Sequence, residues 1–335
     1  MSEIVVKVTR GLLTESIHRA DIAVVSSKGK LLYSLGDPYK TTYMRSAAKP
    51  IQTLNVILSG ADQKFSFTDG EISIMCASHY GEDFHRKTVE EILKKIGLDV
   101  NSLLCGSTLS LNEEYAKKLL WNHVRLNPSY TDCSGKHCGI LAVCVLKGYD
   151  LNTYNLPEHP VQKEIKKILS EVCSVKEDSI IVGVDGCTVP IFGIPLYNMA
   201  LGFCKMANDN VFTGDYKNAA HRVFKAMTAV PEMVAGTGGF CTELMKNTGG
   251  KLIGKLGAEG IYCVGVKGMD LGLAIKIEDG STRALWPTTV KCLEDLQVLN
   301  EEEKKALSKF KIKDNVNNRR EKVGEIFPGF YLNKN

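Results

Sequence analysis

The amino-acid sequence predicts an α/β (α+β) fold in which strands from both ends of the chain share one antiparallel sheet, with helices inserted between them and flanking them. Three features support this prediction: strand-like segments near the N-terminus, strand-like segments joined by short turns after residue 250, and helical periodicity between the two. No run of proline, serine or charged residues divides the chain. We therefore expect one domain over residues 1–335, with a helical part over roughly residues 45–240 placed between the terminal strands.

The N-terminal strands are predicted from composition and from one turn. Residues 4–8 and 22–25 are rich in valine and isoleucine, and residues 31–33 follow a Ser-Lys-Gly-Lys turn at 27–30. Such a turn between two β-rich segments indicates a hairpin.

Three further strands are predicted near the C-terminus, at residues 251–253, 260–264 and 273–277. Short connections between successive strands favour antiparallel pairing. Asp279-Gly280 is a typical hairpin turn, so we expect the chain to turn back along residues 282–284.

The middle of the chain is predicted to be mostly helical. Apolar residues at 89, 92, 93 and 96 have helical spacing and end at Gly97, and Thr68 with Glu71 has capping-box spacing. A helix is expected over residues 137–146, with Gly148 ending it, and another near residues 197–204. Residues 179–184 are predicted to form a buried strand that ends at Asp185.

Composition excludes several classes of protein. The chain has 42 Lys+Arg against 38 Asp+Glu, with 44% hydrophobic and 24% charged residues, which excludes a disordered chain, a collagen and a coiled coil. No apolar stretch reaches the roughly 18 residues of a membrane span, and no basic stripe interleaves with aromatic residues. We therefore expect no membrane and no nucleic-acid partner. The first residues do not have the pattern of a signal peptide, so a cytoplasmic location is expected.

The eleven cysteines divide into two groups. Cys76, Cys144 and others lie in apolar, helix-like runs and are interpreted as small core residues. Without a signal peptide we expect a reducing compartment and no disulfide framework. Cys133, Cys138 and Cys187 lie beside glycine, lysine, histidine and aspartate, and are candidates for chemistry.

One Ser-x-x-Lys element, Ser46 with Lys49, precedes an apolar helix at residues 51–58 that can bury it. This spacing places both side chains on one face of a helical turn, and a buried, neutral lysine can accept the serine proton. Two other copies, at residues 27–30 and 308–311, lie in surface segments. Pro50 places Ser46 at or just before the helix start, where backbone donors favour an anion. A surface serine and lysine at a helix start would give the same pattern.

Two further polar clusters are predicted to lie in loops. Residues 78–82, Ser-His-Tyr-Gly-Glu, separate two helices and form either a site loop or a simple helix connection. Residues 132–137 enter a helix, whose N-terminus would lower the pKa of Cys133, and Cys187 follows a strand end. One cysteine from each segment can share a metal, with His137 or Lys136 as a third ligand, and softness favours zinc. Two buried thiols in a pocket wall are the alternative.

Two other glycine-rich segments are interpreted as decoys. Residues 249–256 nearly match a phosphate-binding loop, but Leu256 stands where a serine or threonine is required, and a strand rather than a helix is expected there. Residues 237–239 are interpreted as a glycine-rich turn.

Five segments in order resemble the Rhizobium etli type-II-like asparaginases, a family of serine amidohydrolases, along almost the whole chain. They are Arg45–Pro50, Ala77–Glu82, Cys133–His137, Asp185–Pro190 and Gly254–Gly260. The resemblance implies a fold of the serine β-lactamase and DD-peptidase type, a homodimer, and two Ser–Lys pairs, Ser46 with Lys49 and Ser78 with Lys255. Leu256 departs from the Lys-Thr-Gly of penicillin-recognising enzymes, and Gly239 stands where relatives often carry a basic residue.

The same resemblance implies zinc held by Cys133, Lys136 and Cys187, which supports substrate binding rather than attacking the substrate. We expect the site to bind L-asparagine and to hydrolyse it to L-aspartate and ammonia, with Ser46 as nucleophile. The residues expected to bind the substrate are Arg45, His79, Glu82, His137 and Asp185.

Three alternatives remain open from the sequence. The first is a glutaminase, or a hydrolase of another small amide such as a β-aspartyl compound. The second is a thiol hydrolase that uses Cys133 with His137 or His79. The third is a non-catalytic, zinc-dependent binding module, which would keep the cysteines but need no serines.

Overall fold

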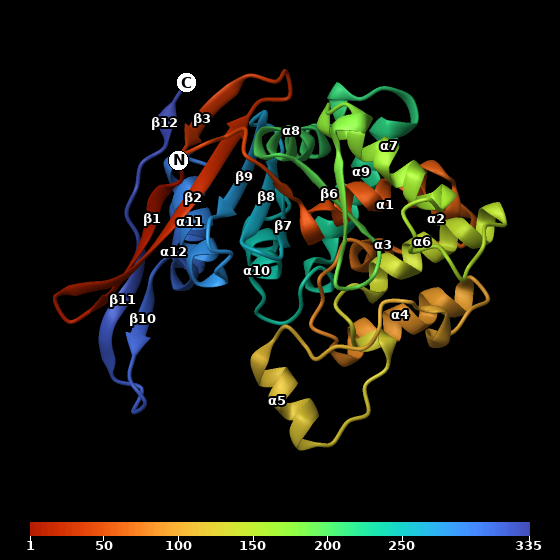
Figure 1. Cartoon of the computed structure of the whole chain (residues 1–335), viewed down its shortest axis with the longest axis horizontal. Helices are drawn as coiled ribbons and strands as arrows, with labels where there is room; N and C mark the ends of the chain where they lie inside the picture. The colour runs from red at the N-terminus through yellow and green to blue at the C-terminus, as the bar shows by residue number, and fades with distance from the viewer. The chain divides into compact units, whose positions relative to one another are not determined.

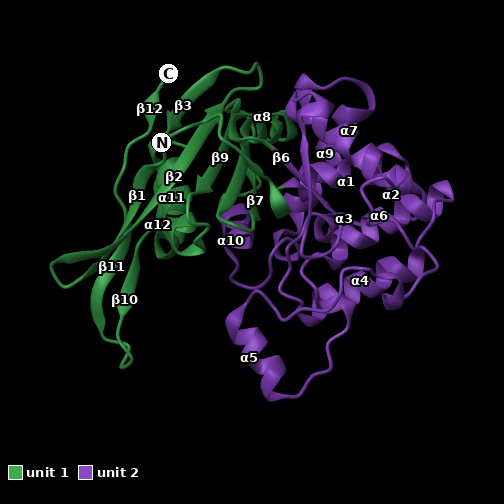
Figure 2. Ribbon diagram, in the orientation of Figure 1, with its two compact units in different colours: residues 1–47, 194–208, 247–335 green, residues 48–193, 209–246 purple.

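The structure, a computed structural model, describes residues 1–335. Figure 1 labels its helices and strands, and Figure 2 colours the two units into which the chain folds. Unit 1 consists of residues 1–47, 194–208 and 247–335, and unit 2 consists of residues 48–193 and 209–246. No helix is long and apolar enough to cross a membrane.

A nine-stranded sheet forms the centre of unit 1. Seven of its strands have the order β10-β11-β1-β2-β9-β8-β7, and β3 pairs with both β2 and β12. All of these pairings are antiparallel. The strands of unit 1 are β1 (Glu3–Arg10), β2 (Leu13–Val25), β3 (Leu31–Leu35), β4 (Thr41–Tyr43), β7 (Leu252–Gly257), β8 (Ile261–Val266), β9 (Leu271–Ile277), β10 (Lys313–Val316), β11 (Lys322–Pro328) and β12 (Asn333–Lys334).

The N-terminal strands β1 and β2 lie side by side in this sheet, between C-terminal strands. Val6 of β1 is opposite Pro328 of β11, and Ala23 of β2 is opposite Ala274 of β9. Every residue of β8 and β9 is buried. A strand covered on both faces is apolar without alternation, which explains the composition of these two segments.

Helices cover both faces of the sheet in unit 1. Gly272 of β9 lies against Ala200 of α8 (Leu196–Ala207), and Gly265 of β8 lies against Phe203 of the same helix. Tyr262 contacts Trp286 of α11 (Thr282–Asp295) edge-on. Because side chains alternate along a strand, residues 262 and 265 of β8 face opposite sides. Helix α8 therefore covers one face and α11 the other, and α11 packs on α12 (Glu301–Lys311).

Unit 2 is built mainly from helices. Its α1 packs on α6, α7 and α9, and its α3 packs on α4, α6 and α9. Strands β5 (Ile181–Val184) and β6 (Pro190–Pro195) pair antiparallel, with Val184 opposite Pro190. The helices are α1 (Lys49–Leu58), α2 (Ala61–Lys64), α3 (Asp69–Met75), α4 (Asp83–Lys95), α5 (Glu113–Trp121), α6 (Ser134–Lys147), α7 (Pro160–Cys173), α9 (Gly214–Ala229) and α10 (Phe240–Asn247, which ends at the unit boundary).

The predicted mixed fold with an antiparallel sheet is confirmed, and so are most of its elements. The hairpin around residues 27–30 joins β2 and β3, and the three predicted C-terminal strands are β7, β8 and β9. Both hydrogen bonds of the Thr68 capping box are present at the start of α3. Gly148 ends α6 in the left-handed conformation.

Three details differ from the sequence analysis. Residues 282–284 begin α11 instead of returning as a strand, because Asp279 accepts the N–H of Ser281 in a turn that enters a helix. Strand β5 is mostly exposed rather than buried. Strands β10, β11 and β12 were not predicted, because their polar residues carry no clear β pattern.

Replacing Gly272 with alanine should destabilise unit 1, because the new Cβ would collide with the Ala200 carbonyl of α8. Overpacking of this kind costs about 1–3 kcal/mol. Urea unfolding measures this loss of stability in Gly272→Ala. Gly329→Ala is the control, since a Cβ at Gly329 meets no atom within 4 Å. Equal stability of the two variants would contradict the close packing of α8 on β9.

Candidate active site

Lys49, the first residue of α1, is the centre of a buried polar cluster in unit 2. Its side chain is 1% exposed. Nζ donates to the Ala77 carbonyl at 2.6 Å, to Ser78 Oγ at 3.1 Å and to Asp132 Oδ2 at 3.4 Å. Lys49 is therefore a hydrogen-bond partner of Ser78, and the predicted pairing of Ser78 with Lys255 stays a prediction.

Close helix packing brings the two polar loops of unit 2 to this lysine. A Cβ on Gly135 of α6 would collide with the Ile74 carbonyl of α3, and one on Gly139 would lie 3.2 Å from Met75 Sδ. Only a residue without a side chain allows helices to approach this closely. The start of α6 therefore lies beside the segment that follows α3, which carries Ser78.

Opposing effects act on the charge of Lys49. Burial acts to lower the pKa of Lys49, but its interactions with Cys133, Asp132 and Cys187 outweigh burial and raise the pKa above its ordinary value. The ammonium form is therefore favoured in the chain alone. The sequence analysis expected a neutral lysine because it considered burial and missed these anions.

Ser46 and Lys255 both belong to unit 1. Ser46 lies in a short 3-10 helix, residues 45–48, directly before α1, and Arg45 has the left-handed φ of 50°. A Cβ on Gly257 of β7 would collide with the Met44 carbonyl, so this end of β7 lies against residues 44–47. Lys255 is fully buried and two residues before Gly257, on the same face of β7. Unit 1 thus brings the Ser46 segment to the strand that carries Lys255.

Two thiols and a carboxylate meet elsewhere in unit 2. The Sγ atoms of Cys133 and Cys187 and a carboxylate oxygen of Asp185 all lie within 4.8 Å of one another. Cys133 is the N-cap of α6, and Cys187 lies in the tight loop after β5. Thr188, next in that loop, has φ of 78°, which is strained for a β-branched residue. Strain of this kind is found where neighbouring structure imposes it, often at functional sites.

The pKa values of the two thiols shift in opposite directions. The hydrogen bond from Cys133 and the charge of Lys136 hold the pKa of Cys187 well below its usual range. The same hydrogen bond, together with burial and the charge of Asp132, raises the pKa of Cys133 far above it. The prediction that the helix N-terminus lowers the Cys133 pKa is therefore wrong, because the neighbouring thiolate outweighs the helix.

Lys136 and His137 complete this cluster. Lys136 Nζ donates to Cys187 Sγ at 3.0 Å, and the Cys133 and Cys187 charges raise the pKa of Lys136 against the effect of burial. His137 is fully buried, and its Nδ1 lies 2.7 Å from the Tyr154 hydroxyl. Its Nε2 has no hydrogen-bond partner.

This donor set fits zinc. Two buried thiols and a half-buried carboxylate lie together, with the Lys136 amine hydrogen-bonded to Cys187, and zinc prefers sulfur and nitrogen ligands. Asp185 belongs to this set by position, whereas the sequence analysis gave it a substrate-binding role.

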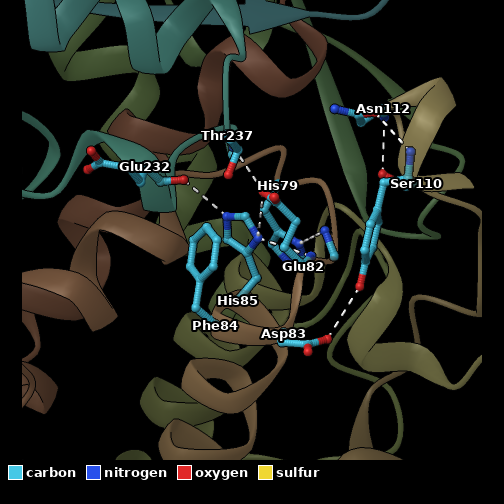
Figure 3. Close-up of polar contacts among 12 residues, drawn as sticks. His79, Glu82, Asp83, Phe84, His85, Ser110, Asn112, Glu232 and Thr237 are labelled. Atoms are coloured by element: carbon cyan, nitrogen blue, oxygen red, sulfur yellow. Dashed lines mark hydrogen bonds and ion pairs between the residues drawn. The ribbon is translucent and has the colours of Figure 1, made fainter. Parts of the chain in front are cut away.

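His79 and Glu82 hold the loop between α3 and α4 (Figure 3). His79 Nδ1 accepts the N–H of Gly81 at 3.0 Å, and its Nε2 lies 2.8 Å from Ser134 Oγ. Glu82 caps α4, and its Oε2 accepts the N–H of Thr237 at 2.9 Å. Both nitrogens of His79 are thus engaged within the protein, so the predicted contact of His79 with substrate finds no free ring atom.

The geometry does not favour a thiol hydrolase. The raised pKa of Cys133 disfavours its thiolate, and neither nitrogen of His79 is free to act as its base. Burial lowers the pKa of His137, with Cys187 rather than Cys133 acting against that shift.

A family model described as L-asparaginase II matches residues 6–328. The chain belongs to the L-asparaginase II family. The asparaginase family inferred from the five motifs is therefore confirmed, while the Rhizobium etli type within it stays a prediction. No curated protein sequence matches this L-asparaginase II family member.

Several solved structures are similar to the chain at low identity. Mglu in its glutamate form is 14% identical over 84% of this chain and 61% of that chain, with a TM-score of 0.38. Another Mglu structure is 13% identical over 84% of this chain and 67% of that chain, with a TM-score of 0.36. A mutant of simvastatin synthase (LovD) from Aspergillus terreus is 10% identical over 77% and 86%, with a TM-score of 0.38. The chain spans about three fifths to two thirds of the Mglu chains.

No individual role was predicted for two residues of this cluster. Asp132 pairs with Lys49, and Tyr154 accepts the N–H of Leu104 at 2.8 Å while it contacts His137. Asp132 adjoins the Cys133 motif, which was the only available signal. Tyr154 lies in an irregular segment, and no sequence pattern indicated a role for it.

The unfolding free energy should fall below pH 6.5, because burial lowers the pKa of His85 to about 4. The unfolded chain binds this proton at higher pH than the folded chain does. The contribution of neutral His85 to the free energy of unfolding is complete above pH 6.5. It is lost as the pH falls toward 4, by about 2 kcal/mol at pH 5. Urea unfolding at pH 7 and pH 5 measures it.

His85→Gln should lose this part of the pH dependence, while His123→Gln, at an exposed position, should keep it. The interpretation fails when wild type and His85→Gln lose equal stability between pH 7 and pH 5.

Proposed function

We propose that the chain is an L-asparaginase that hydrolyses L-asparagine to L-aspartate and ammonia through a serine nucleophile. Membership in the L-asparaginase II family supports the reaction class. The observation that carries the mechanism is the hydrogen bond between the buried Lys49 and Ser78. Lys49 follows Ser46 by three residues in the chain. A hydroxyl beside a lysine is an arrangement that can activate a serine for acyl transfer.

In the proposed reaction, Ser46 Oγ attacks the side-chain amide carbon and passes its proton to Lys49 in its neutral form. The C–N bond then breaks, and Ser78, within hydrogen-bond reach of Lys49, relays a proton to the leaving nitrogen, which departs as ammonia. Water hydrolyses the resulting ester to release L-aspartate and restore Ser46. The anions around Lys49 oppose its neutral form, so the ammonium is its resting state.

Lys255 is proposed as the second lysine of the reaction, and its pairing with Ser78 stays a prediction. Its support is its complete burial and its place on β7, the last strand in the order of the sheet. A buried lysine is uncommon unless its charge is needed or its pKa is shifted for function. Arg45 remains the proposed partner of the substrate carboxylate.

We further propose that Cys133 and Cys187 hold zinc, with Lys136 or Asp185 as the third protein ligand. The compact donor set supports this. Bound there, zinc would supply a positive charge that favours substrate binding. Lys136 needs to lose its proton before it can ligate, whereas Asp185 does not, so the structure offers a carboxylate alternative to the lysine.

The serine β-lactamase and DD-peptidase type of fold is proposed as well. Its support is an antiparallel sheet with helices on both faces in unit 1 and a helical unit 2 that carries Ser78. The homodimer, the cytoplasmic location and the preference for L-asparagine over L-glutamine also stay predictions.

Ser46→Ala should abolish release of ammonia from L-asparagine while the protein stays folded, because it removes only a hydroxyl. Loss of about 10³-fold or more in kcat is expected for a nucleophile. Ser308→Ala is the control, since it changes another Ser-x-x-Lys copy on the exposed face of α12. Ammonia release by Ser46→Ala above a tenth of the wild-type rate would rule out Ser46 as nucleophile.

Cys187→Ala should lose bound zinc and raise KM for L-asparagine about tenfold, with kcat within about threefold, because lost ground-state binding changes KM alone. Zinc content and steady-state kinetics are measured on this variant and on Cys144→Ala, a buried cysteine of α6 outside the cluster. Wild-type protein without zinc, purified under reducing conditions, would refute the site. A thousandfold loss of kcat at constant KM would make zinc catalytic.

A further inference from the structure

The side chains of Ser78 and Tyr80 lie on the same face of an extended segment in unit 2. The N–H groups of Ser78 and Tyr80 donate to the carbonyls of Val234 at 3.0 Å and Ala235 at 2.8 Å. The N–H of His79 donates in the other direction, to the Asp132 carbonyl at 3.2 Å. This alternation is that of a strand, in which side chains two residues apart share a face.

The two faces of this segment have different surroundings. On one face His79 is fully buried, bonded to Ser134 and stacked on His85 with ring centroids 4.9 Å apart. On the other face Ser78 is 1% exposed and bonded to Lys49, while Tyr80 is only half-buried. Tyr80 is therefore the member of this segment that an incoming molecule can reach beside Ser78.

Two glycines fix the position of the Tyr80 ring. A Cβ on Gly236 would lie 2.6 Å from Tyr80 Cδ2, and a Cβ on Gly239 would lie 2.8 Å from the Tyr80 hydroxyl oxygen. The same Cβ on Gly236 would lie 2.6 Å from Glu82 Oε2, and Glu82 binds the N–H of Thr237. Tyr80 and Glu82 thus lie side by side over the turn at residues 236–239, with the ring held flat against backbone.

The Tyr80 hydroxyl is available for a ligand. Burial, aided by the charges of Cys241 and Glu82, raises the pKa of Tyr80 to about 12, so the phenol keeps its proton at neutral pH. A buried or half-buried tyrosine usually finds a partner for its hydroxyl, and no bond of this hydroxyl within the chain is found.

We propose that Tyr80 is a specificity-determining residue, whose hydroxyl bonds the substrate beside Ser78 and whose ring limits the length of the amide side chain. This inference rests on the proposed amidohydrolase function. The chemical class selected is the short side-chain amide, because the fixed ring occupies the space that one more methylene would need. Hydrophobic size selection of this kind is worth about 10–200-fold per methylene.

The experiment measures kcat/KM for L-asparagine and L-glutamine by ammonia release in matched variants. Tyr80→Ala should lower the ratio of the L-asparagine to the L-glutamine value at least tenfold, because the space filled by the ring opens. Tyr80→Phe should keep that ratio within threefold while KM rises about tenfold for both amides, since only the hydroxyl is lost. Tyr149→Phe removes a phenol at the other end of α6 and should change neither.

Gly239→Ala provides a second variant that keeps Tyr80. The added Cβ should displace the phenol, since it would lie within 3 Å of both the hydroxyl oxygen and Ala235 Cβ. It should change the substrate ratio in the same direction as Tyr80→Ala.

Two failures can be told apart. Ammonia release with an unchanged ratio in Tyr80→Ala and Gly239→Ala overturns the inference alone. Folded wild-type protein that releases no ammonia from either amide overturns the proposed function, and the inference with it.

Discussion

The buried ammonium of Lys49 is the constraint on which the site in unit 2 depends. A charge at 1% exposure is costly unless hydrogen bonds and opposite charges surround it. Here it joins the start of α1 to the segment after α3 and to Asp132 before α6. Removing one partner of a buried charge typically costs about 3–5 kcal/mol, so these three segments hold one another in place. Lys49 thus holds Ser78 together with the backbone hydrogen bond from Ser78 N–H to the Val234 carbonyl.

Buried charges of both signs also surround the thiols of Cys133 and Cys187. The two buried cations, Lys49 and Lys136, are balanced by the thiolate of Cys187 and the carboxylates of Asp132 and Asp185. Buried charges of both signs explain why one thiol ionises and its neighbour does not. The strained backbone of Thr188 is tolerated because its loop is held in place by two contacts. Thr188 Oγ1 donates to the Leu104 carbonyl, and Lys136 donates to Cys187.

Local signals account for what could be predicted from the sequence. The Thr68 capping box, the spacing of apolar residues in α4 and Gly148 at the end of α6 each act within a few residues, and all are present. The N-terminus of α11 depends on which of two turn outcomes follows Asp279, and the sequence supports both. The pairing of Lys49 with Ser78 joins residues 29 positions apart, so no spacing rule reveals it. The same holds for the contact of His79 with Ser134, which joins residues 55 positions apart.

Two glycines allow close packing beside the segments that carry these serines and lysines. In unit 2, Gly135 lets α6 touch α3, and Ser78 then lies on Lys49. In unit 1, Gly257 lets β7 touch residues 44–47, so the Ser46 segment lies at the strand that carries Lys255. Packing within each unit therefore fixes the segments that carry these residues. Because a side chain at either glycine would collide with a backbone carbonyl, these two positions constrain the chemistry without any reactive group of their own.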